Sequence, residues 1–119
     1  MDPAIDRYEE AYATADDGEV ERLVAEAFSP VAVLESAYLD QAVVGRAALA
    51  DHIRSTRARL TGTRSVRTSP VERVGNTLRW TWAFEADGQT VAEGTDIALL
   101  DDDGVIERLV VFDERIPPL

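Results

Sequence analysis

Cysteine is absent from the 119-residue sequence, which excludes disulfides, thiolate metal sites and cysteine nucleophiles. Histidine occurs once, at His52, so a transition-metal site would depend on carboxylates alone. We therefore expect no metal and no cofactor. The sequence also lacks any run near the roughly 20 apolar residues of a membrane-spanning helix. The acidic start Met1-Asp2-Pro3 is unlike a signal peptide. These absences predict a cytoplasmic protein.

Lysine is also missing. All 12 basic residues are arginine, against 23 acidic residues, which gives a formal net charge of −11. Such a field repels phosphate backbones and anionic lipid headgroups, so we expect neither a nucleic-acid partner nor a membrane partner. Two origins of the acidity stay open, a salt-adapted proteome and GC-rich coding that favours arginine over lysine. Neither bears on catalysis.

What remains is an ordinary globular composition, with 45% hydrophobic and 29% charged residues. The length lies near the commonest size of a single domain, so we expect one domain over residues 1–119. No internal repeat, linker or low-complexity tract divides the sequence.

Apolar residues recur at helical spacing in three N-terminal segments. The first begins at Asp2-Pro3, where Asp2 is expected to cap the helix and Pro3 to take its first position. Asp16-Asp17-Gly18 ends this helix, and the second helix ends near Phe28. The third spans residues 46–60, with an inward side formed by Leu49, His52, Ile53, Thr56 and Leu60.

From Ser65 onward the periodicity changes from helical to alternating. Strands are expected at residues 31–35, 66–74, 78–85, 90–100 and 105–113, with a loop at 36–44. Pro70 indicates an edge or a bulge in the second of these strands. Turns are expected at Gly75-Asn76, Asp87-Gly88 and residues 101–104, the last in place of a calcium loop. Helices followed by long antiparallel strands predict an α+β fold, in which a curved sheet wraps around the helices and encloses a conical cavity.

Several local phrases then point to a family. They are residues 12–28 (YATADDGEVERLVAEAF), 31–35 (VAVLE), Val44-Gly45-Arg46, Gly94-Thr95-Asp96 and 103–106 (DGVI). In these phrases and in the order of its elements the chain resembles the NTF2-like superfamily, in particular SnoaL-like and ketosteroid-isomerase-like proteins. The resemblance implies an NTF2-like cone, a pocket for a small hydrophobic molecule, and a homodimer formed through the outer face of the sheet. It is specific for fold and weak for activity.

The ketosteroid-isomerase-like pattern has a tyrosine on the first helix, an aspartate base after the first strand and a protonated aspartate on a later strand. Tyr12 and Asp96 fall at the first and third of these positions. Ser36 occupies the base position, so the resemblance implies an oxyanion pair without its standard base. Glu35 is adjacent, but alternation directs it to the surface. His52 is the expected replacement base, and a satisfied structural histidine is the other interpretation.

The face that Asp96 takes depends on strand register. A two-residue turn at Asp87-Gly88 pairs Phe84 with Val91 and sends Asp96 away from the Trp80 face. A three-residue loop, or a bulge at Gly94, places Asp96 on that face. We predict the inward orientation, where burial would raise the pKa of the carboxyl.

The expected pocket is lined by Tyr8, Tyr38, Trp80, Trp82 and Phe112. Three functions are open: a cofactor-free isomerase or cyclase in which Asp96, Tyr12 and His52 carry proton transfer, a ligand-binding module without chemistry, and a dimerisation domain whose cavity is filled by side chains. Tyr12 either donates a hydrogen bond to a ligand or is a core tyrosine that satisfies a carboxylate.

Overall fold

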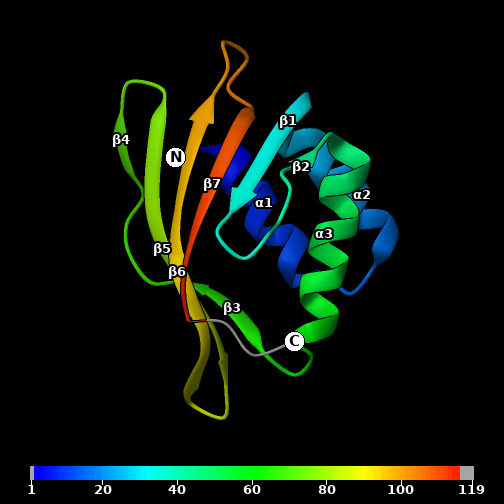
Figure 1. The fold of residues 1–119 in the computed structure, drawn as a ribbon, viewed down its shortest axis with the longest axis vertical. Coiled ribbons are helices and arrows are strands. Elements are labelled where there is room, and N and C mark those ends of the chain that lie inside the picture. The colour runs from blue at the N-terminus through cyan, green and yellow to red at the C-terminus, as the bar shows by residue number, and fades with distance from the viewer. Residues whose placement is uncertain (1, 116–119) are drawn as a thin grey trace.

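The structure is a computed structural model that describes residues 2–115, and it confirms the α+β class. Three helices lie on one side of a curved, seven-stranded sheet in this part of the chain (Figure 1). The helices are α1 (Pro3–Ala13), α2 (Asp17–Ala27) and α3 (Arg46–Arg59). The strands are β1 (Phe28–Ser36), β2 (Val43–Val44), β3 (Arg64–Arg67), β4 (Glu72–Val74), β5 (Thr77–Ala86), β6 (Gln89–Leu100) and β7 (Ile106–Arg115). None of the described helices is long and apolar enough to cross a membrane.

Helices α1 and α2 both follow an aspartate, but the two aspartates act differently. Asp16 caps α2, because its Oδ1 accepts hydrogen bonds from the backbone N–H groups of Gly18 at 2.8 Å and Glu19 at 3.4 Å. Asp2 precedes Pro3 as expected, yet its side chain caps nothing. Its Oδ1 instead accepts a hydrogen bond from Arg73 Nη1 at 2.7 Å. The expected cap at Asp2 is therefore wrong, because an ion pair with β4 takes the carboxylate.

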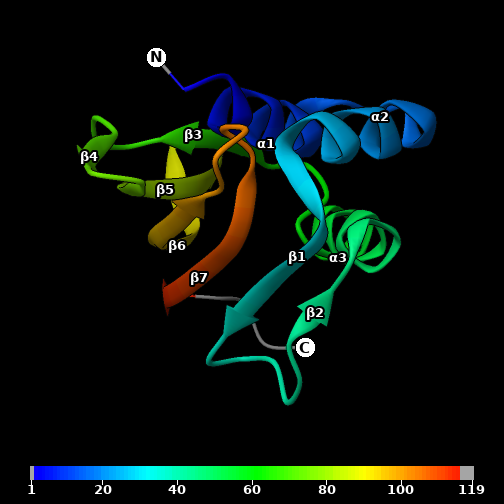
Figure 2. The same ribbon diagram turned by 90° about the horizontal axis from the view of Figure 1, so that it is seen from above.

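The sheet has the order β2-β1-β7-β6-β5-β3, and β4 also pairs with β5. The single strand predicted over residues 66–74 is instead two short strands, β3 and β4, because Pro70 lies in the break between them and cannot donate a ladder hydrogen bond. β1 starts earlier than expected, at Phe28, and the predicted loop 36–44 contains the short strand β2. One pairing departs from the antiparallel expectation, since β1 and β7 run parallel. From above, the strands form a curved wall that faces α3 (Figure 2).

Asp96 lies on the inward face of β6, as predicted, but the cause is neither a three-residue loop nor a bulge at Gly94. The turn at Asp87-Gly88 has two residues, and the pairs Ala86↔Gln89 and Glu85↔Thr90 follow it. The next pair is Phe84↔Ala92, so Val91 is an extra residue in β6. This bulge changes the parity and sets Asp96 directly opposite Trp80.

The core fills the space between the concave face of the sheet and the helices. Its larger part contains Phe28, Leu34, Leu78 and Trp80, the last only 1% exposed. A second, smaller cluster consists of Leu60, Phe84 and Ala92. Tyr12 packs against both clusters and also lines a cavity beside them.

Candidate functional site

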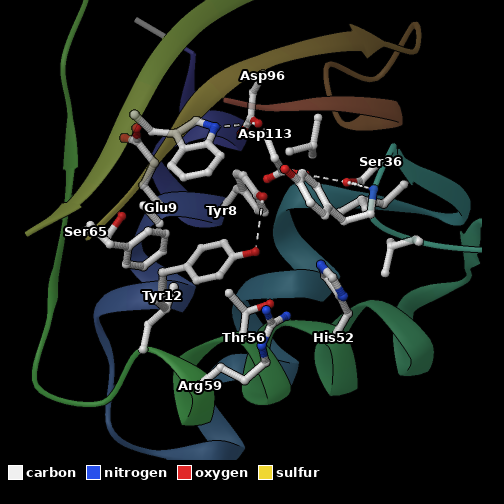
Figure 3. A pocket seen from close by; sticks show the side chains of 18 of the residues that line it. Tyr8, Glu9, Tyr12, Ser36, His52, Thr56, Arg59, Ser65, Asp96 and Asp113 are labelled. Carbon is white, nitrogen blue, oxygen red and sulfur yellow. Dashed lines mark hydrogen bonds between the residues drawn. The ribbon is translucent and has the colours of Figure 1, made fainter. Parts of the chain in front are cut away.

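A cavity of about 360 Å³ opens between the concave face of the sheet and the helices α1 and α3. Its lining is mainly aromatic and aliphatic, with a few polar groups that converge on the interior (Figure 3). Seven of the eight site residues predicted from the sequence line it: Tyr8, Tyr12, Tyr38, His52, Trp80, Trp82 and Asp96. They come from α1, β5, β6, α3 and the loop after β1.

Asp96 is a carboxyl group held in an apolar environment. Its side chain is 3% exposed, and Oδ1 accepts a hydrogen bond from the indole N–H of Trp82 at 2.8 Å. Burial raises the pKa of Asp96 to about 8, while the Trp82 hydrogen bond opposes this shift and the charge of Asp113 adds to it. At neutral pH the carboxyl is therefore protonated and can donate a hydrogen bond into the cavity.

Two tyrosines project from α1 toward this carboxyl. The Tyr8 hydroxyl donates to the Tyr12 hydroxyl at 3.3 Å, and the rings meet edge to face with centroids 5.3 Å apart. Burial raises the pKa of both phenols above the ordinary value, and the charge of Asp96 acts in the same direction. Tyr12 therefore stays protonated and offers a second donor across the cavity from Asp96 (Figure 3).

Asp113 is a cavity residue that the sequence analysis missed. It lies near the end of β7, and its Oδ2 accepts a hydrogen bond from the Ser36 hydroxyl on β1. Burial raises the pKa of Asp113, while the Ser36 hydrogen bond and the charges of His52 and Arg59 oppose the shift. Alternation could have found it, since Leu109 and Val111 precede it at even spacing and face inward.

His52 reaches the cavity from α3, as predicted. Burial lowers its pKa, the nearby Arg59 lowers it further, and the Asp113 carboxylate opposes both effects. The imidazole is therefore neutral at pH 7 and able to accept a proton.

Phe112 is the predicted pocket residue that the structure does not place in the cavity. Its side chain is 54% exposed, because the alternation of β7 turns Val111 and Asp113 inward and Phe112 outward. Tyr38 does line the cavity, but at 57% exposure it belongs to the rim. Its backbone N–H donates to the Ser36 hydroxyl oxygen at 3.2 Å.

Two further sequence predictions, a surface position for Glu35 and a turn at Asp101, agree with the structure. Glu35 lies on the surface, where its Oε1 accepts a hydrogen bond from Arg108 Nε at 2.7 Å. Asp101 forms the predicted turn, because its Oδ1 accepts from the backbone N–H groups of Asp103 at 2.9 Å and Val105 at 3.2 Å.

The fold is shared with many solved structures. A candidate isomerase of the SnoaL-like family from Agrobacterium tumefaciens superposes with a TM-score of 0.85 at 26% identity, covering 93% of this chain and 94% of that one. An NTF2-like protein of unknown function from Exiguobacterium superposes with a TM-score of 0.68 at 24% identity, and the match covers 93% of this chain and 98% of that one. A candidate polyketide cyclase from Sinorhizobium meliloti superposes with a TM-score of 0.64 at 19% identity, and the match covers 93% of this chain and 94% of that one. No family model matches the sequence, and a search of curated proteins finds no match.

Proposed function

We propose that this chain, a member of the NTF2-like superfamily, binds a small, flat, hydrophobic carbonyl compound and moves a proton on it without a cofactor. The observation that carries the proposal is Asp96, a carboxyl that burial keeps neutral inside an apolar cavity with two tyrosine hydroxyls nearby. The structural neighbours described as candidate isomerases and a candidate cyclase agree with this class of reaction.

The cavity lining supports a flat, apolar ligand. The rings of Trp80, Trp82 and Phe84 stand along β5 on the inner face and offer surfaces on which a planar ligand can stack. The cavity volume of about 360 Å³ is in the range of small-molecule sites. We infer a ligand of about two fused rings, with its polar atom directed toward Asp96 and Tyr12.

The polar groups support proton transfer next to a carbonyl. Asp96 and Tyr12 would donate hydrogen bonds to the carbonyl oxygen, where negative charge develops as a proton leaves the adjacent carbon. The C–H electron pair moves into the carbonyl system and gives an enol or enolate. In a conjugated enolate, return of the proton to a different carbon completes an isomerisation. In a molecule with a second carbonyl, attack by the enolate carbon on that carbonyl breaks its π bond, its oxygen takes the proton, and a ring closes. Neither outcome needs an oxidant or a reductant.

A second function has one observation in its favour. Ser36 stands where the ketosteroid-isomerase-like pattern has its base, which favours a binding module that uses the same cavity without chemistry. The third possibility, a domain whose cavity is filled by side chains, has no support in a cavity of this volume.

Two probes separate catalysis from binding. 2-Tetralone is a flat bicyclic ketone, and exchange of the hydrogens next to its carbonyl in deuterated buffer can be followed by NMR. 2-Naphthol is a planar analogue of its enol, and its binding can be followed through its own fluorescence. We expect the protein to bind 2-naphthol and to accelerate exchange above the buffer rate. Binding without acceleration would favour the binding module, and the absence of both would contradict the proposal.

A further inference from the structure

We propose that Asp113 is the base of this site, so that the two cavity carboxyls divide the chemistry: Asp96 donates to the substrate oxygen and Asp113 takes the proton from carbon. The inference rests on the proposed function and replaces His52 in the role predicted for it from the sequence.

The strand register places the two carboxyls on one face of adjacent strands. Asp96 pairs with Val111 and Gly94 pairs with Asp113, so Asp96 and Asp113 occupy diagonal positions across β6 and β7. Such positions have Cα atoms about 7–8 Å apart. Both side chains line the same cavity (Figure 3). A substrate between them can present its oxygen to one carboxyl and its acidic carbon to the other.

Ser36 connects the vacant base position with Asp113. The parallel pairing of β1 with β7 sets Ser36 opposite Val111, two residues before Asp113. The Tyr38 backbone N–H donates to the Ser36 hydroxyl oxygen, and that hydroxyl donates to Oδ2 of Asp113. The serine therefore acts as a donor that orients the carboxylate, which leaves Oδ1 as the proton-accepting atom. Ser36 is a positioning residue in this arrangement.

The electrostatic environment sets the order in which the two carboxyls ionise. Ser36 from β1 and Arg59 from α3 favour the charged form of Asp113, against its partial burial, and His52 from α3 adds to this effect when it is protonated. Asp96 on β6 and the phenols of Tyr8 and Tyr12 on α1 complete its titratable surroundings. Asp96 is more deeply buried, and the charge of Asp113 raises its pKa further, so Asp113 ionises first. Between these two ionisation steps one carboxyl is an acid and the other a base.

The test compares three variants in the 2-tetralone exchange assay, with 2-naphthol binding measured in parallel. Asp113→Asn should lower the exchange rate by about 10²–10⁴-fold, the usual contribution of a general base, while 2-naphthol binding stays as tight or becomes tighter. His52→Gln should lower it by less than about tenfold. Glu114→Gln, the adjacent exposed carboxylate on β7, is the matched control and should leave the rate unchanged.

The pH dependence supplies an independent readout. The wild-type rate should fall at low pH as Asp113 is protonated and fall again above about pH 8 as Asp96 ionises. Ser36→Ala removes a donor to the Asp113 carboxylate, so it should raise the pKa of Asp113 and move the acidic limb to higher pH.

Two results would overturn the inference while the proposed function stands. One is exchange retained in Asp113→Asn and lost in His52→Gln. The other is an acidic limb that Ser36→Ala does not move. If wild-type protein binds 2-naphthol without accelerating exchange, the proposed proton transfer itself is wrong and Asp113 has no role as a base.

Discussion

Asp96 is an acidic residue in a strand whose other inward side chains are small or apolar, among them Ala92, Ala98 and Leu100. Burial of a charged carboxylate in such a place would cost far more folding free energy than burial of a neutral carboxyl that can donate one hydrogen bond and accept another. The Trp82 indole supplies the bond that is accepted. The neighbours of Asp96 thus determine its protonation state, and that state determines what the cavity can bind.

This environment predicts how Asp96→Asn changes stability with pH. Folding raises the pKa of Asp96 from its ordinary value of 3.8 to about 8. Between these values the folded protein holds a proton that the unfolded chain releases, so wild type loses stability as pH rises through this window. Asp96→Asn removes the titrating group and with it this loss of stability at higher pH. Relative to wild type, Asp96→Asn should gain about 3–4 kcal/mol of stability between pH 5 and pH 8, at about 1.4 kcal/mol per pH unit.

Thermal or urea unfolding of both proteins at the two pH values measures the change. A variant that instead loses stability at pH 8 but not at pH 5 would mean that the native carboxylate is ionised and paired, and the donor role of Asp96 would be wrong.

Gly94 is required by the Trp82–Asp96 contact. A Cβ at this position would lie 2.5 Å from the Trp82 ring and 2.5 Å from the Phe112 carbonyl oxygen. We expect Gly94→Ala to destabilise the protein by about 1–3 kcal/mol and to weaken 2-naphthol binding, because the indole must move away from Asp96. Gly18→Ala, in the first turn of α2, is the control and should change stability by less than about 1 kcal/mol. Equal effects of the two substitutions in urea unfolding would contradict this role.

At the scale of elements, the sequence predicted which segments fold but not all of their pairings. Clean alternation from Leu78 to Phe84 was sufficient to define the inner face of β5. It could not locate the bulge at Val91, because a single extra residue leaves the apolar pattern on either side intact. The inward orientation of Asp96 was therefore predicted correctly, but from a bulge at Gly94 or a longer turn instead of the bulge at Val91.

The parallel pairing of β1 with β7 could not be predicted from local sequence patterns. It joins segments about 75 residues apart, as in Ser36↔Val111. No residue pattern in either strand identifies the strand with which it pairs. Without that pairing the sequence offers no reason to connect Ser36 with Asp113. Most of the cavity lining, Asp113 included, could be predicted from helix and strand periodicity, whereas the link between Ser36 and Asp113 required the tertiary pairing.

The inner face of β5 can be tested through its largest buried side chain. Trp80 is 1% exposed and lies between the core and the cavity. Trp80→Ala should lower the free energy of unfolding by about 3–5 kcal/mol. Arg79→Ala on the outer face removes a surface ion pair with Glu72 and should cost less than about 1 kcal/mol. Urea unfolding measures both, and a loss under about 1 kcal/mol for Trp80→Ala would contradict the assigned face.

At the scale of the whole molecule, the outer face of the sheet remains apolar at its centre. Ile97 and Val110 face each other there, and the exposed ring of Phe112 lies beside them. An antiparallel sheet with one solvated face normally carries polar residues in these positions. We propose that a second copy of the chain covers this face and that the protein is a homodimer.

Sedimentation should give a dimer at roughly tens of micromolar, a range ordinary for homodimers. Phe112→Asp should produce a folded monomer, whereas Val31→Asp, an equally drastic change at an exposed residue of β1, should not. Because each chain carries a net charge of −11, added salt should strengthen association by screening repulsion. A wild-type monomer at every salt concentration would contradict the proposed interface.

The most direct test is a pH titration of the two cavity carboxyls by carbon NMR, on protein labelled at the aspartate carboxyl carbon. Spectra of Asp96→Asn and Asp113→Asn identify the two resonances. The Asp96 resonance should shift with a midpoint near pH 8, and the Asp113 resonance should shift at lower pH while Asp96 is still protonated. An Asp96 resonance that titrates near pH 4, with the surface aspartates, would contradict the division of the cavity into one acid and one base.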